Sequence, residues 1–230
     1  ALSRHPDYER WIEKSRSASG VDIFAEASTW PDDIRNDPRF YDEDRELATP
    51  KLSGLSDTAR HKRWHYVDLD AAGKTKSGEL DAQIERLSRL LRSTGKKAEI
   101  SYALPWLAHL VADIHQPLHV GRHGDEGGNR VEIENPFNKR LPFSNLHVYW
   151  DDLPGPPWLR GKRLAQNAAR LLETHPAPAQ GNVALWRDES HDLLAEAYPD
   201  ANGSLLPIIS DDFRRRSRAI ADRRIVEAGY

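Results

Sequence analysis

Residues 98–116 have the sequence AEISYALPWLAHLVADIHQ, a long apolar stretch whose spacing predicts a buried helix. Pro117 ends this helix, because proline disfavours helical geometry in the residue that precedes it. His109 and Asp113 lie four positions apart within the stretch, so both side chains leave the same side of the helix. Burying a histidine and a carboxylate there is unfavourable unless a partner or an ion satisfies them.

Helical spacing predicts most of the other elements as well. A short helix is expected to follow a cap at Ser144 or Asn145 and to end before Pro154. The other predicted helices cover residues 79–93, 158–173, 183–197 and 205–228. Only residues 130–133 alternate like a strand, and long polar connections occupy residues 31–76 and 120–141. We therefore predict an all-α fold: a single-domain helical bundle over residues 1–230, with long loops.

Composition limits the class of protein. The 230 residues carry 33 basic and 36 acidic side chains, which gives a net charge of −3. This balance excludes non-specific wrapping of duplex nucleic acid as the main activity, but it leaves open an enzyme that acts on nucleic acid. No apolar run reaches the roughly 18–20 residues that a membrane helix needs, and no signal-type apolar region opens the chain. With no cysteine, any metal ion must be held by histidine, aspartate or glutamate.

A second histidine–carboxylate pair, His147 and Asp151, repeats the spacing of His109 and Asp113. Two such pairs in one small domain indicate a metal site. On the residues alone, a surface ion pair or a hydrogen-bonded core histidine stays open at each position. His119 lies just beyond the end of the apolar helix, where a turn of the chain can direct it toward a nearby cation.

Two earlier segments are weaker candidates for metal ligands. Residues 30–35, WPDDIR, hold a carboxylate pair followed by an arginine, and residues 64–68, WHYVD, hold a histidine between aromatic rings. Taken alone, Asp32 or Asp33 can be a helix cap, and His65 can be a packed core residue. His115 lies on a different face of its helix from His109, so we expect a structural role for it.

Taken in order along the chain, these motifs resemble the S1/P1 nuclease family, which comprises single-strand-specific zinc nucleases and 3′-nucleotidases related in fold to zinc-dependent phospholipases C. The resemblance rests on WPD at residues 30–32, WHYVD at 64–68, LAHLVADIHQPLH at 107–119, GGN at 127–129, NLHVYWD at 145–151, WRDES at 186–190 and EAG at 227–229. It implies a zinc-dependent enzyme that hydrolyses phosphodiester bonds in single-stranded RNA or DNA to 5′-nucleotides, with 3′-nucleotidase activity.

The resemblance implies a cluster of three zinc ions, with ligands for two of them visible in this sequence. The first ion would be bound by Asp32, His65, His109 and Asp113, and another by His119, His147 and Asp151. Asp113 would also bridge the first ion to the third. Imidazole and carboxylate ligands suit zinc, and incomplete coordination leaves positions for water or substrate.

The resemblance also implies roles in catalysis and substrate binding. Asp32 would orient the attacking hydroxide, and Arg35 would bind a phosphate with its planar guanidinium. Tyr66 would stack on a base, which requires that base to be unpaired, and Asp68 would accept N–H groups of the base. Ordinary packing in the core is the alternative role for Tyr66. Asn129 would lie near the phosphate.

The amino end departs from the family pattern. The family's third zinc is held by an N-terminal tryptophan and a histidine a few residues later, whereas this chain begins ALSRHP. We expect His5 not to be that ligand, and we expect residues 1–11 to form part of a later helix. The family's N-terminal helix is then expected to be missing, which makes a catalytically impaired metal-binding helical protein one alternative.

Two further alternatives stay open. A zinc-dependent phospholipase C would use a similar cluster but should present apolar loops near the site, and the polar runs at residues 37–51 and 135–140 argue against it. The second alternative is a helical protein whose histidine–aspartate pairs bind no metal ion. The expected partners are single-stranded RNA or DNA and 3′-nucleotides as substrates, without a stable protein partner or a membrane. By resemblance the enzyme would be periplasmic or secreted, and the lack of cysteine favours a bacterial enzyme over a disulfide-bearing fungal one.

Overall fold

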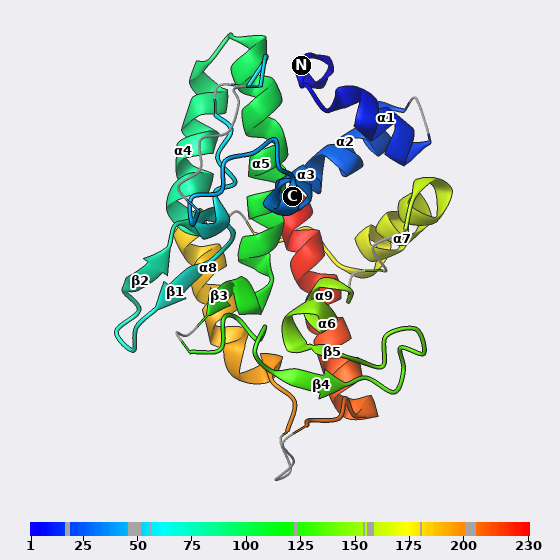
Figure 1. Ribbon diagram of the computed structural model, residues 1–230. Coiled ribbons are helices and arrows are strands. Elements are labelled where there is room, and N and C mark those ends of the chain that lie inside the picture. Colours follow the sequence, from blue (N-terminus) through cyan, green and yellow to red (C-terminus); the bar gives the residue numbers. More distant parts are fainter. Residues whose placement is uncertain are drawn as a thin grey trace.

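Helix α5, Lys97–His115, runs through the middle of the molecule (Figure 1). The computed structural model describes residues 1–16, 19–45, 52–55, 57–121, 124–153, 155, 159–179, 181–200 and 206–230. Helix α4, Leu80–Ser93, lies alongside α5. Helices α2 (Gly20–Ser28), α8 (Val183–Asp192) and α9 (Asp211–Gly229) also pack against it. The apolar stretch singled out in the sequence is therefore the central helix of the fold.

The remaining elements are mostly short. The other α-helices are α1 (Tyr8–Ser15), α3 (Trp30–Asp33), α6 (Leu146–Asp151) and α7 (Gly161–Thr174). Single turns of 3₁₀ helix cover Leu2–Arg4, Ile34–Asn36, Lys62–His65, Pro117–His119 and Leu193–Ala197. The strands are β1 (Val67–Leu69), β2 (Thr75–Gly78), β3 (Val120–Gly121), β4 (Glu132–Glu134) and β5 (Phe143–Asn145). The fold is mainly helical, as predicted.

Two clusters of buried apolar side chains hold these elements together, and we call them the first and the second core. The first core lies among α1, α2, α3, α4 and α5, and its largest side chains are Trp11, Trp30, Trp64 and Trp106. The second core joins β4, α6 and α9, and its largest side chains are Trp150, Tyr149 and Phe213. Burial of such aromatic side chains supplies much of the hydrophobic stabilisation of a core.

A small sheet connects two segments that are far apart in the sequence. Strand β1 pairs antiparallel with β2 and parallel with β3, where Val67 lies opposite Val120. The parallel pair brings the segment after His65 next to the segment after His119. The prediction of a polar connection throughout residues 31–76 is therefore wrong, because strands of three or four residues and single helical turns give almost no periodic signal.

The predicted helices are confirmed in the part of the chain that the structure describes, with three corrections near their ends. Helix α7 begins at Gly161, and Arg160 before it is extended. Residues 193–197 form a 3₁₀ turn instead of continuing α8. Helix α9 begins at Asp211, where the Ser210 side chain accepts a hydrogen bond from the Phe213 amide. Residues before it are extended, since the Glu134 amide donates to the Pro207 carbonyl. The predicted helix starts at residues 158 and 205 lie outside the described residues.

The amino end forms two helical pieces instead of part of one helix. The 3₁₀ turn Leu2–Arg4 ends before Pro6, and α1 begins at Tyr8. Between them His5 is buried, with its ring stacked on Trp11 at a centroid distance of 4.4 Å. Its ring thus packs against two tryptophans of the first core, Trp11 and Trp30. Among the described residues, no helix combines the length and apolar character that crossing a bilayer requires.

Candidate metal centre

A first group of metal-ligating side chains comes from three separate elements. Asp32 lies in α3, His65 ends a 3₁₀ turn and His109 lies in α5, and one ligand atom of each lies within 4.8 Å of the others. The Nε2 atom of His109 is 3.1 Å from Nδ1 of His65. The Asp32 Oδ1 atom is 3.7 Å from that Nε2 and 3.8 Å from that Nδ1. The three atoms converge on one point, as ligands of a single ion do.

Backbone and carboxylate contacts orient the two histidines of this first group. The Nδ1 atom of His109 donates to the Ser28 carbonyl at 2.9 Å, which turns Nε2 toward His65. One carboxylate oxygen of Asp113, Oδ2, lies 3.2 Å from His65 Nδ1 and 3.3 Å from His109 Nε2. Asp113 is therefore a fourth donor for the first group, and the spacing of four residues between His109 and Asp113 does place both on one side of α5.

A second group consists of His119, His147 and Asp151. His119 ends the 3₁₀ turn that follows α5, and the other two lie one turn apart on α6. The Asp151 carboxylate oxygens lie 3.8 Å from His119 Nε2 and 3.5 Å from His147 Nε2. Asn145 caps the start of α6 with its side chain, as predicted.

Hydrogen bonds to backbone carbonyls orient the histidines of the second group too. The Nδ1 atom of His119 donates to the His65 carbonyl at 2.5 Å, and Nδ1 of His147 donates to the Gly127 carbonyl at 2.8 Å. In both rings the other nitrogen, Nε2, therefore points toward the Asp151 carboxylate. The Gln116 side chain donates to Asp151 at 3.0 Å, which fixes the carboxylate. Such outer partners set the tautomer and direction of metal-binding histidines.

Asp113 lies between the two groups. While its Oδ2 atom faces His65 and His109, its Oδ1 atom is 3.8 Å from Nε2 of His119. The side chain is buried, so its charge acts at short range on both sides. A carboxylate in this position can bind two ions at once.

Charge coupling inside this cluster is strong. Burial lowers the pKa of His109 and of His119, but the surrounding carboxylates together outweigh it and raise each pKa to about 9. Asp113 acts on both rings, with Asp32 at His109 and Asp151 at His119. Burial dominates at His65 and His147 and lowers the pKa of both. Despite its own burial, the pKa of Asp113 is held well below its usual range by the charges of His109 and His119. Within each group, the pKa values of the two histidines are therefore shifted in opposite directions.

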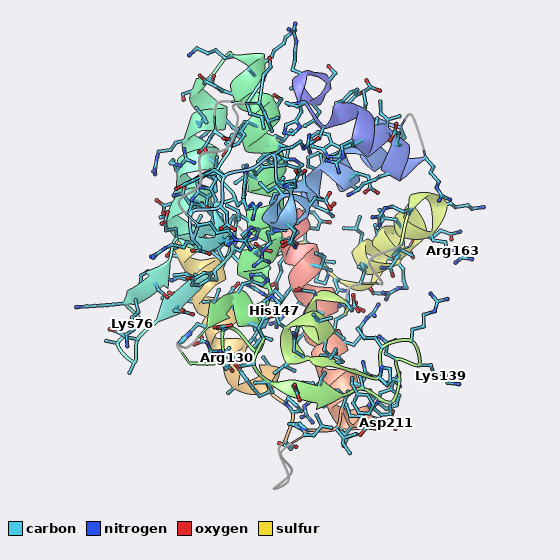
Figure 2. All side chains as sticks on the ribbon, in the orientation of Figure 1. Lys76, Arg130, Lys139, His147, Arg163 and Asp211 are labelled. Carbon is cyan, nitrogen blue, oxygen red and sulfur yellow. The ribbon has the colours of Figure 1, made fainter. Side chains whose placement is uncertain are left out.

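A cleft of about 650 Å³ opens beside the two groups. Of the predicted site residues, it is lined by Arg35, His65, Tyr66, Asp68, His119, Asn129 and His147. Figure 2 shows His147 near the middle of the view, with Arg130 of the same cleft beside it, whereas Lys76 of β2 extends away from the molecule. The cleft is wide enough for a nucleotide-sized ligand.

The sheet places the predicted base-binding residues on the wall of this cleft. Tyr66 precedes β1, and a Cβ atom at Gly78 would lie 2.1 Å from the Tyr66 carbonyl oxygen, so only glycine allows the close approach of β2. Asp68 lies opposite Ser77 in the β1–β2 register, and the Ser77 hydroxyl donates to its Oδ2 atom at 2.6 Å. The Oδ1 atom of Asp68 lies beside Gly121, where a Cβ atom would be 3.3 Å away. One oxygen of Asp68 is thus fixed by Ser77.

The Arg35 guanidinium lies 3.4 Å from the Asp32 carboxylate. Both side chains are about half exposed, which leaves Arg35 accessible to an anionic ligand at the first group. Asn129 follows two glycines and donates from its side chain to the Glu126 carbonyl at 2.8 Å.

Two histidine–aspartate groups joined by a buried aspartate, beside a polar cleft, agree with the motifs of the sequence. A family model described as S1/P1 Nuclease matches residues 5–230. The chain belongs to the S1/P1 nuclease family.

Relatives of this S1/P1 nuclease family member include plant endonucleases. Endonuclease 1 of Arabidopsis thaliana is 36% identical over 225 residues, covering 87% of this chain and 70% of that protein. Endonuclease 3 of the same plant is 29% identical over 148 residues, covering 62% of this chain and 46% of that protein. Endonuclease 4 is 46% identical over 54 residues, covering 24% of this chain and 17% of that protein. The matched part is thus under half of Endonuclease 3 and of Endonuclease 4.

The structure of this S1/P1 family member brings all seven predicted metal ligands together. His115 lies outside both groups: its Nδ1 atom donates to the Val111 carbonyl at 2.7 Å, and its ring packs against Trp186 at a centroid distance of 5.2 Å. The sequence reasoning missed the outer partners, namely the carbonyls of Ser28 and Gly127 and the side chains of Gln116 and Ser77. No residue type marks a carbonyl acceptor, although the GGN motif pointed to the loop that supplies one of them.

Proposed function

We propose that this protein is a metal-dependent nuclease that hydrolyses phosphodiester bonds in single-stranded RNA or DNA. The observation that supports this most directly is the placement of Asp113 between two groups of ligands that open on one cleft. Membership of the S1/P1 nuclease family supports the same activity. The donor set fits zinc, because imidazoles and carboxylates that converge within one short distance are ligands that zinc takes in proteins.

The residues that would hold the ions are those of the two groups, with Asp113 shared. A bound zinc ion supplies Lewis-acid chemistry: it neutralises charge on a phosphate and makes water acidic enough to attack near neutral pH. Asp32 is about half exposed, so it can accept a proton from an attacking water at the edge of the cleft. Arg35 beside it can bind two oxygens of the scissile phosphate with its planar guanidinium.

Tyr66 and Asp68 would bind the base next to the scissile bond. A base can stack on the Tyr66 ring only when it is unpaired, and such stacking contributes roughly 1–3 kcal/mol. The free oxygen of Asp68 can accept an N–H group of that base. Asn129 lies across the cleft, on the glycine-rich loop, and would face the phosphate. These roles together favour single strands over duplexes.

We also propose 3′-nucleotidase activity, since a terminal 3′-phosphate can occupy the same position as the internal one. A third zinc ion bound by Asp113 and export from the cytoplasm stay predictions that rest on the resemblance. A phospholipase C is disfavoured, because Leu118 is the only aliphatic side chain among the described residues that line the cleft. Lipid substrates need a broader apolar surface beside the phosphate.

The test uses the purified protein, stripped of metal with a chelator and reloaded with zinc. We expect zinc-dependent cleavage of single-stranded RNA and DNA and release of phosphate from 3′-AMP, with much slower cleavage of duplex DNA. Cleavage of phosphatidylcholine alone would establish the phospholipase instead. Bound zinc without turnover of any substrate would favour the catalytically impaired alternative, and failure to bind zinc would overturn the proposal.

A further inference from the structure

The loop of residues 124–130 adopts a backbone conformation that glycine makes possible. Gly127 and Gly128 have φ angles of +61° and +79°. A Cβ atom at Gly127 would lie 2.5 Å from the Leu118 carbonyl oxygen, and one at Gly128 would lie 3.3 Å from Cβ of Leu146. The loop is therefore pressed against the start of α6, and there the Gly127 carbonyl accepts the hydrogen bond from His147.

One carboxylate holds this loop in place. One oxygen of Asp125 accepts a hydrogen bond from the Gly128 amide at 3.2 Å, and the other accepts one from the Tyr198 hydroxyl. Burial, together with the Asp125 charge, raises the pKa of Tyr198, so the hydroxyl remains a donor at neutral pH. Asp125 thus joins the loop to the segment that follows α8.

That segment is itself attached to α6. The residue before Tyr198 is Ala197, whose carbonyl accepts a hydrogen bond from the Trp150 indole at 2.9 Å. Trp150 lies on α6 between His147 and Asp151, and it belongs to the second core. A continuous series of hydrogen bonds therefore links two residues of α6. It runs from Trp150 to the Ala197 carbonyl, from Tyr198 to Asp125, and from the glycine-rich loop to His147.

We infer that Asp125 and Tyr198 are positioning residues for the second group of metal ligands. They fix the Gly127 carbonyl, which fixes the tautomer and direction of the His147 ring and so turns its Nε2 atom toward Asp151. The inference rests on the proposed function, because it concerns an ion held by that group. Neither residue touches the ion or the substrate.

The hydroxyl of Tyr198 provides the sharpest test, because Tyr198→Phe keeps the ring and removes only the hydrogen bond to Asp125. Loss of a direct outer partner of a metal-binding histidine weakens metal binding about 10–100-fold. Tyr198 acts on His147 through Asp125 and the Gly127 carbonyl, so its loss should have an effect at the lower end of that range. We expect zinc titration of the whole protein against a competing chelator to show one class of sites weakened about tenfold, with the other sites unchanged. Tyr230→Phe is the matched control, because that side chain is exposed at the end of α9, and it should bind zinc as the wild type does.

A double-substitution experiment separates positioning from a general loss of stability. In a chain that already carries His147→Ala, Tyr198→Phe should have no further effect on the remaining zinc, because the ring that it positions is gone. Asp125→Ala should weaken the same class of sites. Asp125→Asn should restore much of the binding, since its side-chain oxygen can accept from the Gly128 amide while its amino group donates to the Tyr198 hydroxyl oxygen. The thermal unfolding of the metal-free variants should stay close to that of the wild type.

Three results would overturn the inference: unchanged zinc binding in Tyr198→Phe, equal weakening of every site, or a tenfold loss that persists in the His147→Ala background. These differ from failure of the proposed function, in which the wild type itself binds no zinc. The readout is metal affinity, so the inference is testable whichever substrate the protein cleaves.

Discussion

The two groups of ligands belong to different cores and are held in different ways. Beside the first core, His65 packs against Trp106, His109 packs against His65, and the Ser28 carbonyl of helix α2 orients His109. In the second core, His147 lies on a helix of six residues and is oriented by a loop that only glycine can form. Asp32 and Asp151 are both about half exposed, so each group opens to solvent through its aspartate.

The two groups of metal ligands differ in what fixes the positions of their side chains. Ligands of the first group come from positions far apart in the chain, so their geometry depends on the packing of several helices. Ligands of the second group come from two short neighbouring elements, and a few hydrogen bonds decide their direction. Substitutions in the first group should therefore affect the whole centre, whereas substitutions in the second should affect one ion and leave the other.

The largest effect is expected from His109→Ala, which removes a ligand of the first group and leaves His65 as the only imidazole of that group beside Asp113. We expect nuclease activity to fall at least ~1000-fold, about 4 kcal/mol in the activation free energy. Zinc content, measured on the dialysed protein, should fall as well. His115→Ala is the control on the same helix, and it should retain both zinc and activity. Equal losses in the two variants would contradict the assignment of helix faces.

The first core should also be the more sensitive to acid, because it buries His5. Burial, opposed by the Asp7 charge and assisted by that of Arg39, lowers the pKa of His5 from 6.5 to about 4. Below pH 6.5, His5 is protonated in the unfolded chain but stays neutral in the folded chain until the pH approaches 4. The contribution of His5 to the unfolding free energy is therefore fully present above pH 6.5 and is lost as the pH falls toward 4. Between pH 7 and 4 this should remove roughly 3 kcal/mol of the unfolding free energy.

Denaturant titration of metal-free protein at several pH values measures this loss. The variant His5→Phe keeps an aromatic ring against Trp11 and has no proton to bind. Its unfolding free energy should therefore fall less steeply with pH than that of the wild type. Parallel curves for the two proteins would show that His5 does not titrate in this range.

A smaller effect is expected from Asp151→Asn in the second group. The neutral amide is a poorer zinc ligand, so activity should fall on the order of 100-fold, near 3 kcal/mol. Zinc at the first group should remain, which titration with a competing chelator can establish. Asp152→Asn changes the neighbouring aspartate, which follows the end of α6 and lines a different pocket, and it should leave zinc binding intact. Loss of all zinc from Asp151→Asn would show that the two groups do not bind independently.

The smallest effect is expected on the wall of the cleft. Tyr66→Ala should raise KM for a single-stranded dinucleotide with little change in zinc content, because it removes stacking worth roughly 1–3 kcal/mol. Tyr66→Phe keeps the ring and should behave almost as the wild type does. Ser77→Ala frees Asp68 and should change the preference among bases only a few-fold, about 1 kcal/mol. A fall in kcat without a rise in KM for Tyr66→Ala would place this ring outside the base-binding site.

Much of this arrangement is visible in the sequence, because periodic and local features determine it. The spacing of four residues placed His109 with Asp113 and His147 with Asp151 on common helix faces, and the structure agrees. The convergence of Asp32 and His65 on α5 came from the resemblance, since no local pattern encodes contacts across so many residues. Strands β1 and β3 were missed because their pairing is parallel and covers only Val67–Asp68 against Val120–Gly121. Carbonyl acceptors such as that of Gly127 depend on backbone geometry, which residue type alone does not specify.

Helix α5 ends at the metal centre, with Asp113 in its last turn. The carboxyl end of a helix carries about half a unit of negative charge, and here three aspartates, Asp32, Asp113 and Asp151, add to it. Without ions, these charges oppose the approach of a phosphate to the end of α5, although Arg35, Lys62 and Arg130 line the cleft beside it. Bound divalent ions would offset the negative charge there. Ion loading would then govern how closely an anionic phosphate approaches the ligands, before any bond is broken.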